Sequence, residues 1–463
     1  MKFVYGILLT LCITLTVQAQ EKEPFEDVAH QILKDSIPMR TVVGYGQVPK
    51  FAKYLEKYFL DAGFHSEDIM LFEHDETMGM IVRYRGDGRS GQKPILVSSH
   101  LDVVEALPKD WERDPYTLIE ENGFYFGRGV LDTKLNVAAI TATFLRLKAE
   151  NFVPSRDLII AFSGDEETSM ATTGLMATKY KDLIDADFAI VADGGGGTLN
   201  EHGEPISFVV DGAEKTYATF YVTAKNEGGH SSLPRRDNAI YDLSEALMRL
   251  ANYDFPVKHS DLTLAYFERM APMVGGEVGQ AMMDFVANQN NQAAINKLRE
   301  YPEYRGTIGT TCVATMLEGG HAQNALPQSA TATINCRIYP GEGIDKTLQQ
   351  LKDVMNNDTF EWALDMIDVV PESPSSPMRE DVFSAVERAI HAEYPNVPII
   401  PHLSLGASDG AHFRAAGISS YAMMGIFIKN SDEFSHGLNE RTPVESLPLS
   451  MRIWHRLLRD LAG

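Results

Sequence analysis

The chain has 463 residues, of which 44% are hydrophobic and 23% are charged, and its 41 Lys and Arg against 64 Asp and Glu give a formal net charge of −23. This composition is sufficient for one large or two medium hydrophobic cores, which excludes a disordered chain and a small disulfide-stapled scaffold. The excess of acidic residues argues against partners such as nucleic acid or an anionic membrane, because both require a basic surface.

Residues 1–19 have the pattern of a secretory signal peptide. Lys2 precedes an apolar run that extends from Phe3 to Val17, and Ala19 offers a small residue for signal peptidase. A membrane anchor is the weaker alternative, since the run is shorter than the roughly 20 apolar residues of a spanning helix. We therefore predict an exported protein, secreted or periplasmic, without a membrane span.

Two cysteines, Cys312 and Cys336, remain after the signal. An oxidising destination permits a disulfide between them. Because Cys336 falls on the apolar face of an alternating segment, a buried free thiol is an equal alternative, and the sequence leaves the pairing open.

The first half of the mature chain alternates between helical and strand patterns. Residues 51–59 have apolar side chains at helical spacing, and short apolar runs follow at 95–97, 158–162 and 188–192, with an amphipathic helix at 135–147. Continuous apolar runs of strand length are typical of strands that are covered on both faces. The pattern predicts an α/β fold with a largely parallel sheet.

From about Gly212 the pattern changes. Residues 217–223 and 330–338 alternate between polar and apolar side chains, as strands with one solvated face do. Residues 240–250 have the spacing of a helix packed on that sheet. We predict a second, smaller α+β domain with a helical insertion at about 255–305.

Residues 371–377 have the Pro- and Ser-rich composition of a linker, and helix and strand patterns resume after it. This suggests one catalytic domain, built from residues 20–212 and 371–463. Residues 213–370 would interrupt it as an inserted lid or dimerisation domain.

Histidine and carboxylate side chains follow each apolar run. A His-Leu-Asp segment at 100–102 follows the first run, an Asp-Glu-Glu segment at 165–167 the second, and Asp193 the third, while Asp132 precedes the amphipathic helix. Because ligands gather at the carboxyl ends of parallel strands, we expect these groups at one sheet edge. Each Asp alone is most often a turn or helix-capping residue. Together they would repel one another without cations, and a His with carboxylates suits Zn²⁺, with Mn²⁺ or Co²⁺ as alternatives.

Five motifs occur in order along the chain: Ser-His-Leu-Asp-Val-Val at 99–104, Trp111, Gly-Arg-Gly-Val-Leu-Asp-Thr-Lys at 127–134, Gly-Asp-Glu-Glu at 164–167 and Ser-His-Gly-Leu-Asn-Glu at 435–440. They resemble the motifs of the dinuclear zinc exopeptidases, which include carboxypeptidase S, glutamate carboxypeptidase, carnosinase-type dipeptidases, aminoacylase and succinyl-diaminopimelate desuccinylase. The resemblance covers essentially the whole mature chain. It implies a mixed, largely parallel sheet flanked by helices and interrupted by a ferredoxin-like inserted domain.

The resemblance also implies a site for two divalent metal ions, most simply Zn²⁺. Asp132 would bridge the two ions. His100 and Asp193 would complete the protein ligands of one ion, and Glu167 and His436 those of the other.

Two further carboxylates would support this metal site. Asp102 would fix the tautomer of the His100 ring, and Glu166 would be the general base that takes a proton from water and passes it to the leaving amine. Thr133 departs from the family, in which a second Asp often follows the bridging one, so the local hydrogen bonding there is open.

Five residues outside this cluster match segments that contact the substrate in the family. His230 would stabilise the oxyanion across a dimer, Asn324 and Arg337 would bind the substrate carboxylate, and Gly406 and Ser408 would face the substrate. From the residues alone, His230 also fits a loop histidine in a Gly-rich turn. The Gly406 segment likewise fits a simple turn.

The sequence therefore predicts an exported zinc-dependent metalloexopeptidase, a carboxypeptidase or dipeptidase that hydrolyses a peptide bond next to a free carboxylate through a metal-activated water. An N-acyl-amino-acid amidohydrolase with the same machinery is the alternative. A catalytically inactive metal-binding protein is a third reading, disfavoured because Glu166 is present. We expect a homodimer formed through the inserted domain.

Overall fold

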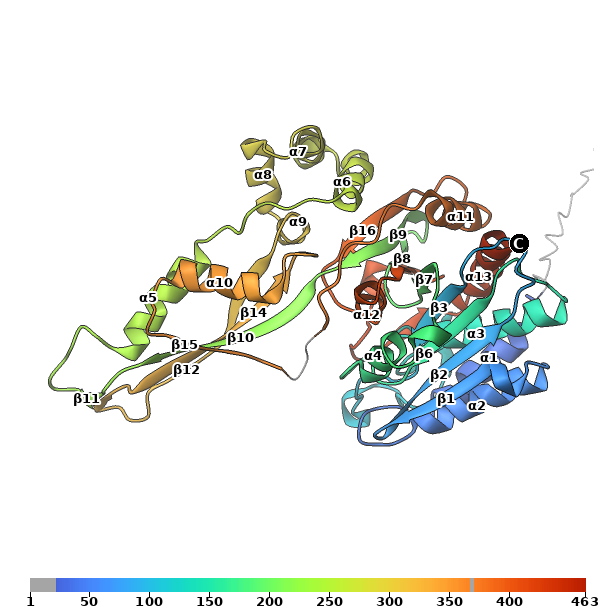
Figure 1. Ribbon diagram of the computed structural model, residues 1–463, viewed down its shortest axis with the longest axis horizontal. Helices are drawn as coiled ribbons and strands as arrows, with labels where there is room; N and C mark the ends of the chain where they lie inside the picture. The colour runs from blue at the N-terminus through green and yellow to red at the C-terminus, as the bar shows by residue number, and fades with distance from the viewer. Residues whose placement is uncertain (1–21, 367–369) are drawn as a thin grey trace, which may run out of the picture.

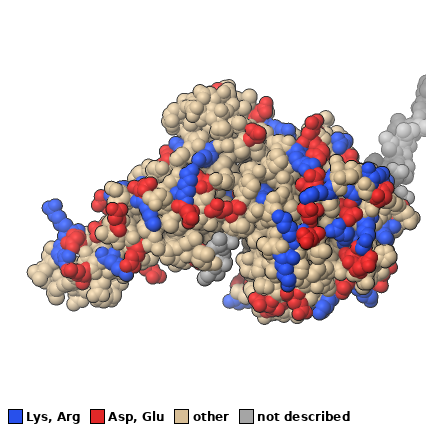
Figure 2. Space-filling view, viewed as in Figure 1, with Lys and Arg blue, Asp and Glu red and all other residues tan. Residues whose placement is uncertain are grey.

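The computed structural model describes residues 22–366 and 370–463, so the predicted signal peptide lies outside the described residues. The chain forms a large part built on a ten-stranded sheet and a smaller part built on a four-stranded sheet (Figure 1). Among the described residues, no helix combines the length and the apolarity needed to cross a membrane. Acidic and basic side chains are interspersed over the face shown in Figure 2.

The ten-stranded sheet is mixed, with a parallel centre. In spatial order the strands are β1 (Ile69–His74), β2 (Thr77–Tyr84), β6 (Leu158–Ser163), β3 (Ile95–His100), β7 (Phe188–Val191), β17 (Ser419–Ala422), β9 (Pro205–Glu214), β8 (Gly196–Leu199) and β18 (Phe427–Lys429), and β16 (Ile399–Ser404) also pairs with β9. Strands β6, β3, β7 and β17 run parallel to one another, whereas β2 pairs with β6 in antiparallel fashion. The predicted fold class is confirmed.

Helices cover both faces of this sheet, which explains the continuous apolar runs. Ile160 packs into the core on one face and Ile159 into the core on the other, and both are fully buried. The first face is covered by α1 (Glu26–Ser36), α2 (Val48–Asp61), α3 (Lys134–Ala149), α11 (Glu380–His391) and α13 (Ser446–Ala462), and the second by α4 (Ala171–Ala177) and α12 (Gly410–Ala415).

The smaller sheet is antiparallel and has helices on one face. Its strand order is β12 (Thr311–Gly319), β14 (Ser329–Ile338), β10 (Thr216–Lys225) and β15 (Glu361–Leu364), with α5 (Ala239–Ala251) and α10 (Ile344–Met355) packed on it. The chain order β-α-β-β-α-β is that of a ferredoxin-like fold. Phe220 is buried against the helices, whereas its neighbour Tyr221 lies on the solvated face. Cys312 and Cys336, opposite one another on β12 and β14, form a disulfide.

The helical insertion packs on the large sheet, although it lies between strands of the small sheet in the sequence. It consists of α6 (Asp261–Val274), α7 (Gly276–Ala287), α8 (Gln292–Arg299) and α9 (Pro302–Thr307). Phe267 and Phe285 share one hydrophobic cluster with Ile400 of β16 and Val209 of β9. The insertion therefore extends the large core over β16 (Figure 1).

The chain passes into the small part between β9 and β10, and it re-enters the large part through residues 371–377. β9 ends at Glu214 and β10 begins at Thr216, with the buried Lys215 between them. On the return path, residues 371–377 form no helix or strand, in keeping with a linker. They are nevertheless fixed to the large part, because the Ser376 N–H donates to the Gly212 carbonyl at 2.8 Å.

Candidate active site

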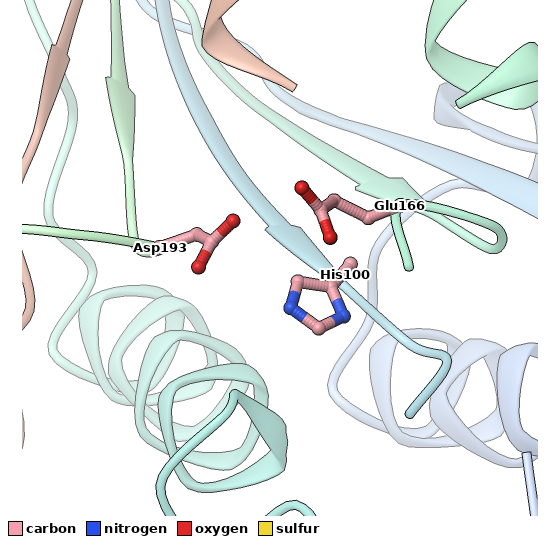
Figure 3. A group of neighbouring side chains, drawn as sticks. All are labelled: His100, Glu166 and Asp193. Carbon is pink, nitrogen blue, oxygen red and sulfur yellow. The ribbon is translucent and has the colours of Figure 1, made fainter. Parts of the chain in front are cut away.

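Three neighbouring strands deliver ionisable side chains to one edge of the large sheet. His100 is the last residue of β3, and Glu166 and Asp193 follow β6 and β7, which flank β3 in parallel register. Figure 3 shows the three side chains converging at the strand ends. One ligand atom from each lies within 4.8 Å of the others. The expected gathering at the carboxyl ends is thus present.

Asp132, immediately before α3, lies between two histidines. Its Oδ1 is 2.8 Å from His100 Nε2, and its Oδ2 is 3.0 Å from His436 Nε2. His436 Nε2 is also 2.9 Å from Glu167 Oε2. The other Glu167 oxygen, Oε1, is buried with no hydrogen-bond partner among the described residues. This donor set of imidazole nitrogens and carboxylate oxygens, with an unsatisfied buried oxygen, fits a metal site.

The electrostatics of the cluster favour a bound cation. Burial raises the pKa of Glu166 well above its ordinary value, and the nearby Asp193 carboxylate raises it further. Burial likewise raises the pKa of Asp193. Hydrogen bonds with Asp132 and Glu167 raise the pKa of His436 to about 10. The ionised forms of Glu166 and Asp193 are thus disfavoured here without a nearby positive charge, and a divalent ion would supply that charge.

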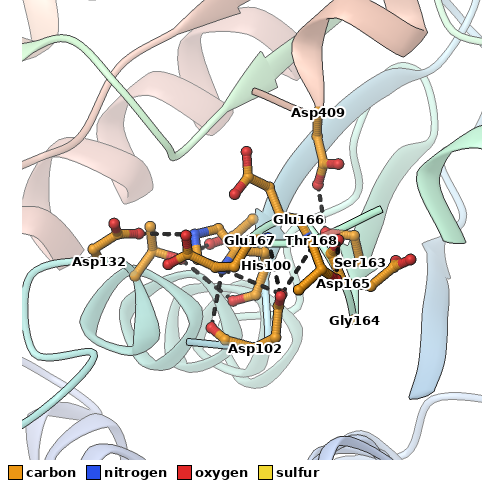
Figure 4. A network of polar contacts seen from close by, with 12 residues as sticks. His100, Asp102, Asp132, Ser163, Gly164, Asp165, Glu166, Glu167, Thr168 and Asp409 are labelled. Atoms are coloured by element: carbon orange, nitrogen blue, oxygen red, sulfur yellow. Dashed lines mark hydrogen bonds and ion pairs between the residues drawn. The ribbon is translucent and has the colours of Figure 1, made fainter. Parts of the chain in front are cut away.

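Asp102 holds both the His100 ring and the turn after β6 (Figure 4). Its backbone carbonyl lies 3.1 Å from His100 Nδ1. Its carboxylate accepts the N–H groups of Glu166 at 3.1 Å and Glu167 at 3.0 Å. With Nδ1–H donated to that carbonyl, Nε2 is the nitrogen that would bind a metal ion, in place of the proton that it donates to Asp132 here.

Thr133 fills a buried position between β3 and α3. Its hydroxyl is 2.8 Å from Ser99 Oγ and donates to the His100 carbonyl at 3.3 Å, and the Asp132–Thr133 peptide bond is cis. The hydroxyl of Thr133 therefore has its hydrogen-bond partners in β3, the strand that carries His100.

Asp165, the first carboxylate after β6, has the capping role that such residues most often have. Its side chain accepts the N–H groups of Ala171 at 2.7 Å and Thr172 at 3.0 Å, at the start of α4. It faces away from the metal-ligand cluster and fixes the far end of the Glu166 turn.

The predicted oxyanion donor lies far from this cluster within one chain. His230 is in β11 (Gly229–His230), which pairs with β13 (Ala325–Leu326) at the far tip of the small part (Figure 1). It is exposed and neighbours Asn324, whose carbonyl accepts the Ser231 N–H at 3.1 Å. His230 Nδ1 accepts the Ser232 N–H at 3.2 Å, so its Nε2 carries the proton and is free to donate.

Arg337 lies at the opposite end of the small sheet from Asn324. It is the penultimate residue of β14, paired with Tyr217 at the start of β10, and its Nη1 donates to the Leu405 carbonyl at 3.3 Å. The two predicted carboxylate-binding residues are therefore not together in one chain. Gly406 is exposed beside this contact.

Ser408 points inward. It is buried, and its hydroxyl donates to Glu214 at 2.7 Å, while Arg414 pairs with the same carboxylate at 2.9 Å. Ser408 is therefore fixed to the end of β9, and only the neighbouring Gly406 is open to solvent.

The model of Peptidase family M20/M25/M40 matches residues 96–460. The chain belongs to this family. It is 26% identical over 419 residues to the N-fatty-acyl-amino acid synthase/hydrolase PM20D1 of Xenopus tropicalis, covering 89% of this chain and 80% of that protein. It is also 26% identical over 385 residues to the probable carboxypeptidase S-like 2 of Dictyostelium discoideum, covering 80% of this chain and 72% of that protein.

The fold of this M20 chain is similar to the crystal structure of the M20 family metallo-carboxypeptidase Sso-CP2 from Sulfolobus solfataricus. The TM-score is 0.68 at 18% identity, covering 94% of this chain and 99% of the other. The predicted family resemblance is confirmed, and the chain is a metal-dependent hydrolase.

One buried carboxylate of this M20 chain received no role from the sequence. Asp409, in the segment after Ser408, accepts the hydroxyls of Ser163, at the end of β6, and Thr173 at 2.5 Å. Burial raises its pKa to about 7. The sequence analysis singled out the Gly406 segment next to Asp409. The hydrogen-bond partners of Asp409 lie more than 230 positions away, so no local pattern reveals them.

Proposed function

We propose that this chain is a dinuclear metallohydrolase that cleaves an amide bond next to a free carboxylate. The observation that carries the proposal is the position of Asp132, whose two carboxylate oxygens each face a different histidine. Asp132 would therefore be shared by two ions. His100 and Asp193 would hold one of them, and Glu167 and His436 would hold the other.

Zn²⁺ is the ion that this ligand set favours, with Mn²⁺ and Co²⁺ as alternatives, because imidazole and carboxylate ligands suit all three. Bound there, the ions supply Lewis-acid polarisation of the scissile carbonyl and lower the pKa of water. Three protein ligands per ion leave an open position, so Glu166 is not needed as a ligand, although it lies within reach of His100 and Asp193.

Glu166 is our proposed general base. A raised pKa makes its buried carboxylate a stronger base towards the attacking water, and the same group would then pass that proton to the leaving amine. Asp102 positions this base by accepting its backbone N–H. The alternative of an inactive metal-binding protein is disfavoured, because Glu166 and its contact with Asp102 are both present.

We propose that the remaining groups act in a homodimer. His230 presents a free Nε2–H at the tip of the small sheet, suited to donate to an oxyanion, and Arg337 and Asn324 suit a substrate carboxylate. The outer strand β12 exposes Val313 (60%), Met316 (61%) and Leu317 (60%) to solvent. An unpaired, apolar edge strand is a template for pairing with a second copy.

The scissile bond has two candidate forms. A peptide bond is our leading proposal, supported by the peptidase family and by the carboxypeptidase S-like relative. An N-acyl-amino acid is the second candidate, supported by the relatives named N-fatty-acyl-amino acid synthase/hydrolase. Export through residues 1–19 remains a proposal that rests on the sequence.

Metal quantitation coupled to a substrate panel tests the proposed function. We expect close to two divalent ions per chain, and loss of both bound ions and activity in Asp132→Ala. Dipeptides, N-acetyl amino acids and long-chain N-acyl amino acids should be compared on the same preparation. Exclusive turnover of the acyl series would reject the peptidase in favour of the amidohydrolase, and full activity without metal would reject both.

A further inference from the structure

A buried glutamate near the end of the chain contacts the loop that carries Asp132. Glu440 is completely buried, and its Oε1 accepts the N–H groups of Leu131 at 2.8 Å and Asp132 at 3.1 Å. Its Oε2 accepts the N–H of Gly129 at 3.1 Å and Arg128 Nη1 at 2.6 Å. One carboxylate thus binds four donors, three of them backbone groups of the loop that ends at the proposed bridging ligand.

Arg128 extends this contact to the loop that carries His436. While its Nη1 binds Glu440, its Nη2 donates to the Gly437 carbonyl at 3.1 Å. His436 has a φ of 60°, in the left-handed region that residues other than glycine rarely adopt. The Trp111 ring, 5.2 Å from the guanidinium carbon, covers the buried Arg128. Arg128 therefore binds the Gly437 carbonyl, directly after His436 with its unusual backbone conformation.

Further contacts join the same two segments. β19 (Arg441–Pro443) pairs with β5 (Phe124–Phe126), which in turn pairs with β4 (Ile119–Glu121). The Gly127 N–H donates to the Glu440 carbonyl at 3.2 Å. Two loops about 300 positions apart in the sequence are thereby held together by Glu440 and Arg128. One loop carries Asp132 and the other carries His436, the two proposed metal ligands.

We propose that Glu440, acting with Arg128, is a positioning residue that sets Asp132 and His436 for the two metal ions together. The proposal rests on the proposed function, and it explains why the motifs at 127–134 and 435–440 occur in one chain. A carboxylate offers acceptors on both sides, so it satisfies all four donors at once. An amide of the same shape has only one oxygen, and its NH₂ would face two of those donors.

Glu440→Gln is the test, with Asp187→Asn as the matched control. Asp187 likewise joins distant segments, through Arg379 at 2.8 Å and Arg156 at 3.2 Å, but it precedes β7 and so lies at the opposite edge of the sheet. We measure Zn²⁺ affinity in chelator-buffered solutions, and the visible absorption spectrum of the Co²⁺-loaded protein. Loss of such a supporting contact typically weakens metal affinity 10- to 100-fold.

We expect Glu440→Gln to weaken binding of both ions by at least about 10-fold and to change the Co²⁺ spectrum, whereas Asp187→Asn keeps wild-type values for both. Arg128→Lys is the second variant, because lysine keeps the charge but cannot span Glu440 and the Gly437 carbonyl. It should change the Co²⁺ spectrum and weaken affinity even if Glu440→Gln does not fold.

The outcomes separate the two proposals. A wild-type protein that binds no divalent ion would reject the proposed function itself. If the wild-type protein binds two ions but Glu440→Gln keeps the wild-type metal affinity and Co²⁺ spectrum, the positioning role alone would be rejected. Where Glu440→Gln does not fold, an unchanged affinity and spectrum in Arg128→Lys would reject that role in the same way. Equal losses in Asp187→Asn would also reject it, because a general loss of structure would then explain the effect.

Discussion

The metal-ligand edge of the large sheet and the tip of the small sheet differ in how far one chain completes them. At the edge, Asp132 contacts both His100, which is buried, and His436, which is exposed but also contacts the carboxylate of Glu167. At the tip, His230 and Asn324 are exposed and lie beside one another, far from those residues. Under the proposed function, one chain supplies all the metal ligands, whereas the groups at the tip act only when a second copy brings them to the site.

This difference separates two kinds of chemistry. The proposed ligands and base would have to be held rigidly around charge, and they lie on strand ends and loops that are fixed from several sides. The proposed oxyanion donor and carboxylate-binding residues would have to admit and release a substrate, and a separate surface suits that role. The comparison predicts that changes at the edge affect metal or chemistry directly, whereas changes at the tip act through assembly.

The largest effect is expected at the edge, from Glu166→Gln. Removal of a general base typically lowers kcat by 10²- to 10⁴-fold, while both ions remain because Asp132, Asp193 and Glu167 are unchanged. Activity and metal content should be measured on the same sample. Glu167→Gln is the matched comparison, since it should also lose bound metal. If Glu166→Gln lost an ion, Glu166 would be a ligand and the assignment of the base would be wrong.

A smaller effect is expected at the tip, from His230→Ala. Loss of one oxyanion donor typically lowers kcat by 10²- to 10³-fold, and metal content should not change. If His230 acts across a dimer, mixing this variant with Glu166→Gln creates mixed dimers with one intact site. Random reassociation of equal amounts should then restore about a quarter of wild-type activity.

The β12 edge provides the control for that mixing experiment. Leu317→Lys places a charge on the exposed apolar edge strand and should reduce dimer formation, measured by sedimentation. When His230→Ala and Glu166→Gln each also carry Leu317→Lys, mixing the two proteins should restore no activity. Recovery from mixed monomers, or full activity of a monomeric protein, would contradict the role of His230 in trans.

Much of the edge could be predicted because local patterns specify it. The apolar runs that became β3, β6 and β7 place their following residues together through a general rule about parallel strands. The sequence also indicated the open face of the small sheet, since Tyr221 and its alternating neighbours are polar on one side. The spacing of the apolar residues and their position along the chain were sufficient to predict these features.

Other features depend on contacts between distant residues, which no local pattern encodes. Glu440 and Asp409 are each one carboxylate in a loop until the fold supplies the donors around them. The direction of Ser408 depends on Glu214 at the end of a remote strand. The helical insertion covers Ile400 of β16, and this strand begins 138 positions after the insertion does.

The smallest effect is expected where the two regions meet, at Lys215 between β9 and β10. This lysine is buried, its Nζ donates to the Gly309 carbonyl at 2.6 Å, and burial lowers its pKa to about 7.

Between a pH of about 7 and the ordinary lysine pKa of 10.5, Lys215 binds a proton in the unfolded chain but not in the folded chain. The contribution of Lys215 to the free energy of unfolding therefore rises with pH across this window, by at most about 1.4 kcal/mol per pH unit. Lys215→Met should make the free energy of unfolding in urea depend less steeply on pH between pH 7 and 9.5 than it does in the wild type. Lys225→Met, which removes an exposed lysine from the far end of β10, should keep the wild-type slope. An unchanged slope in Lys215→Met would mean that the lysine titrates normally and that the junction admits water.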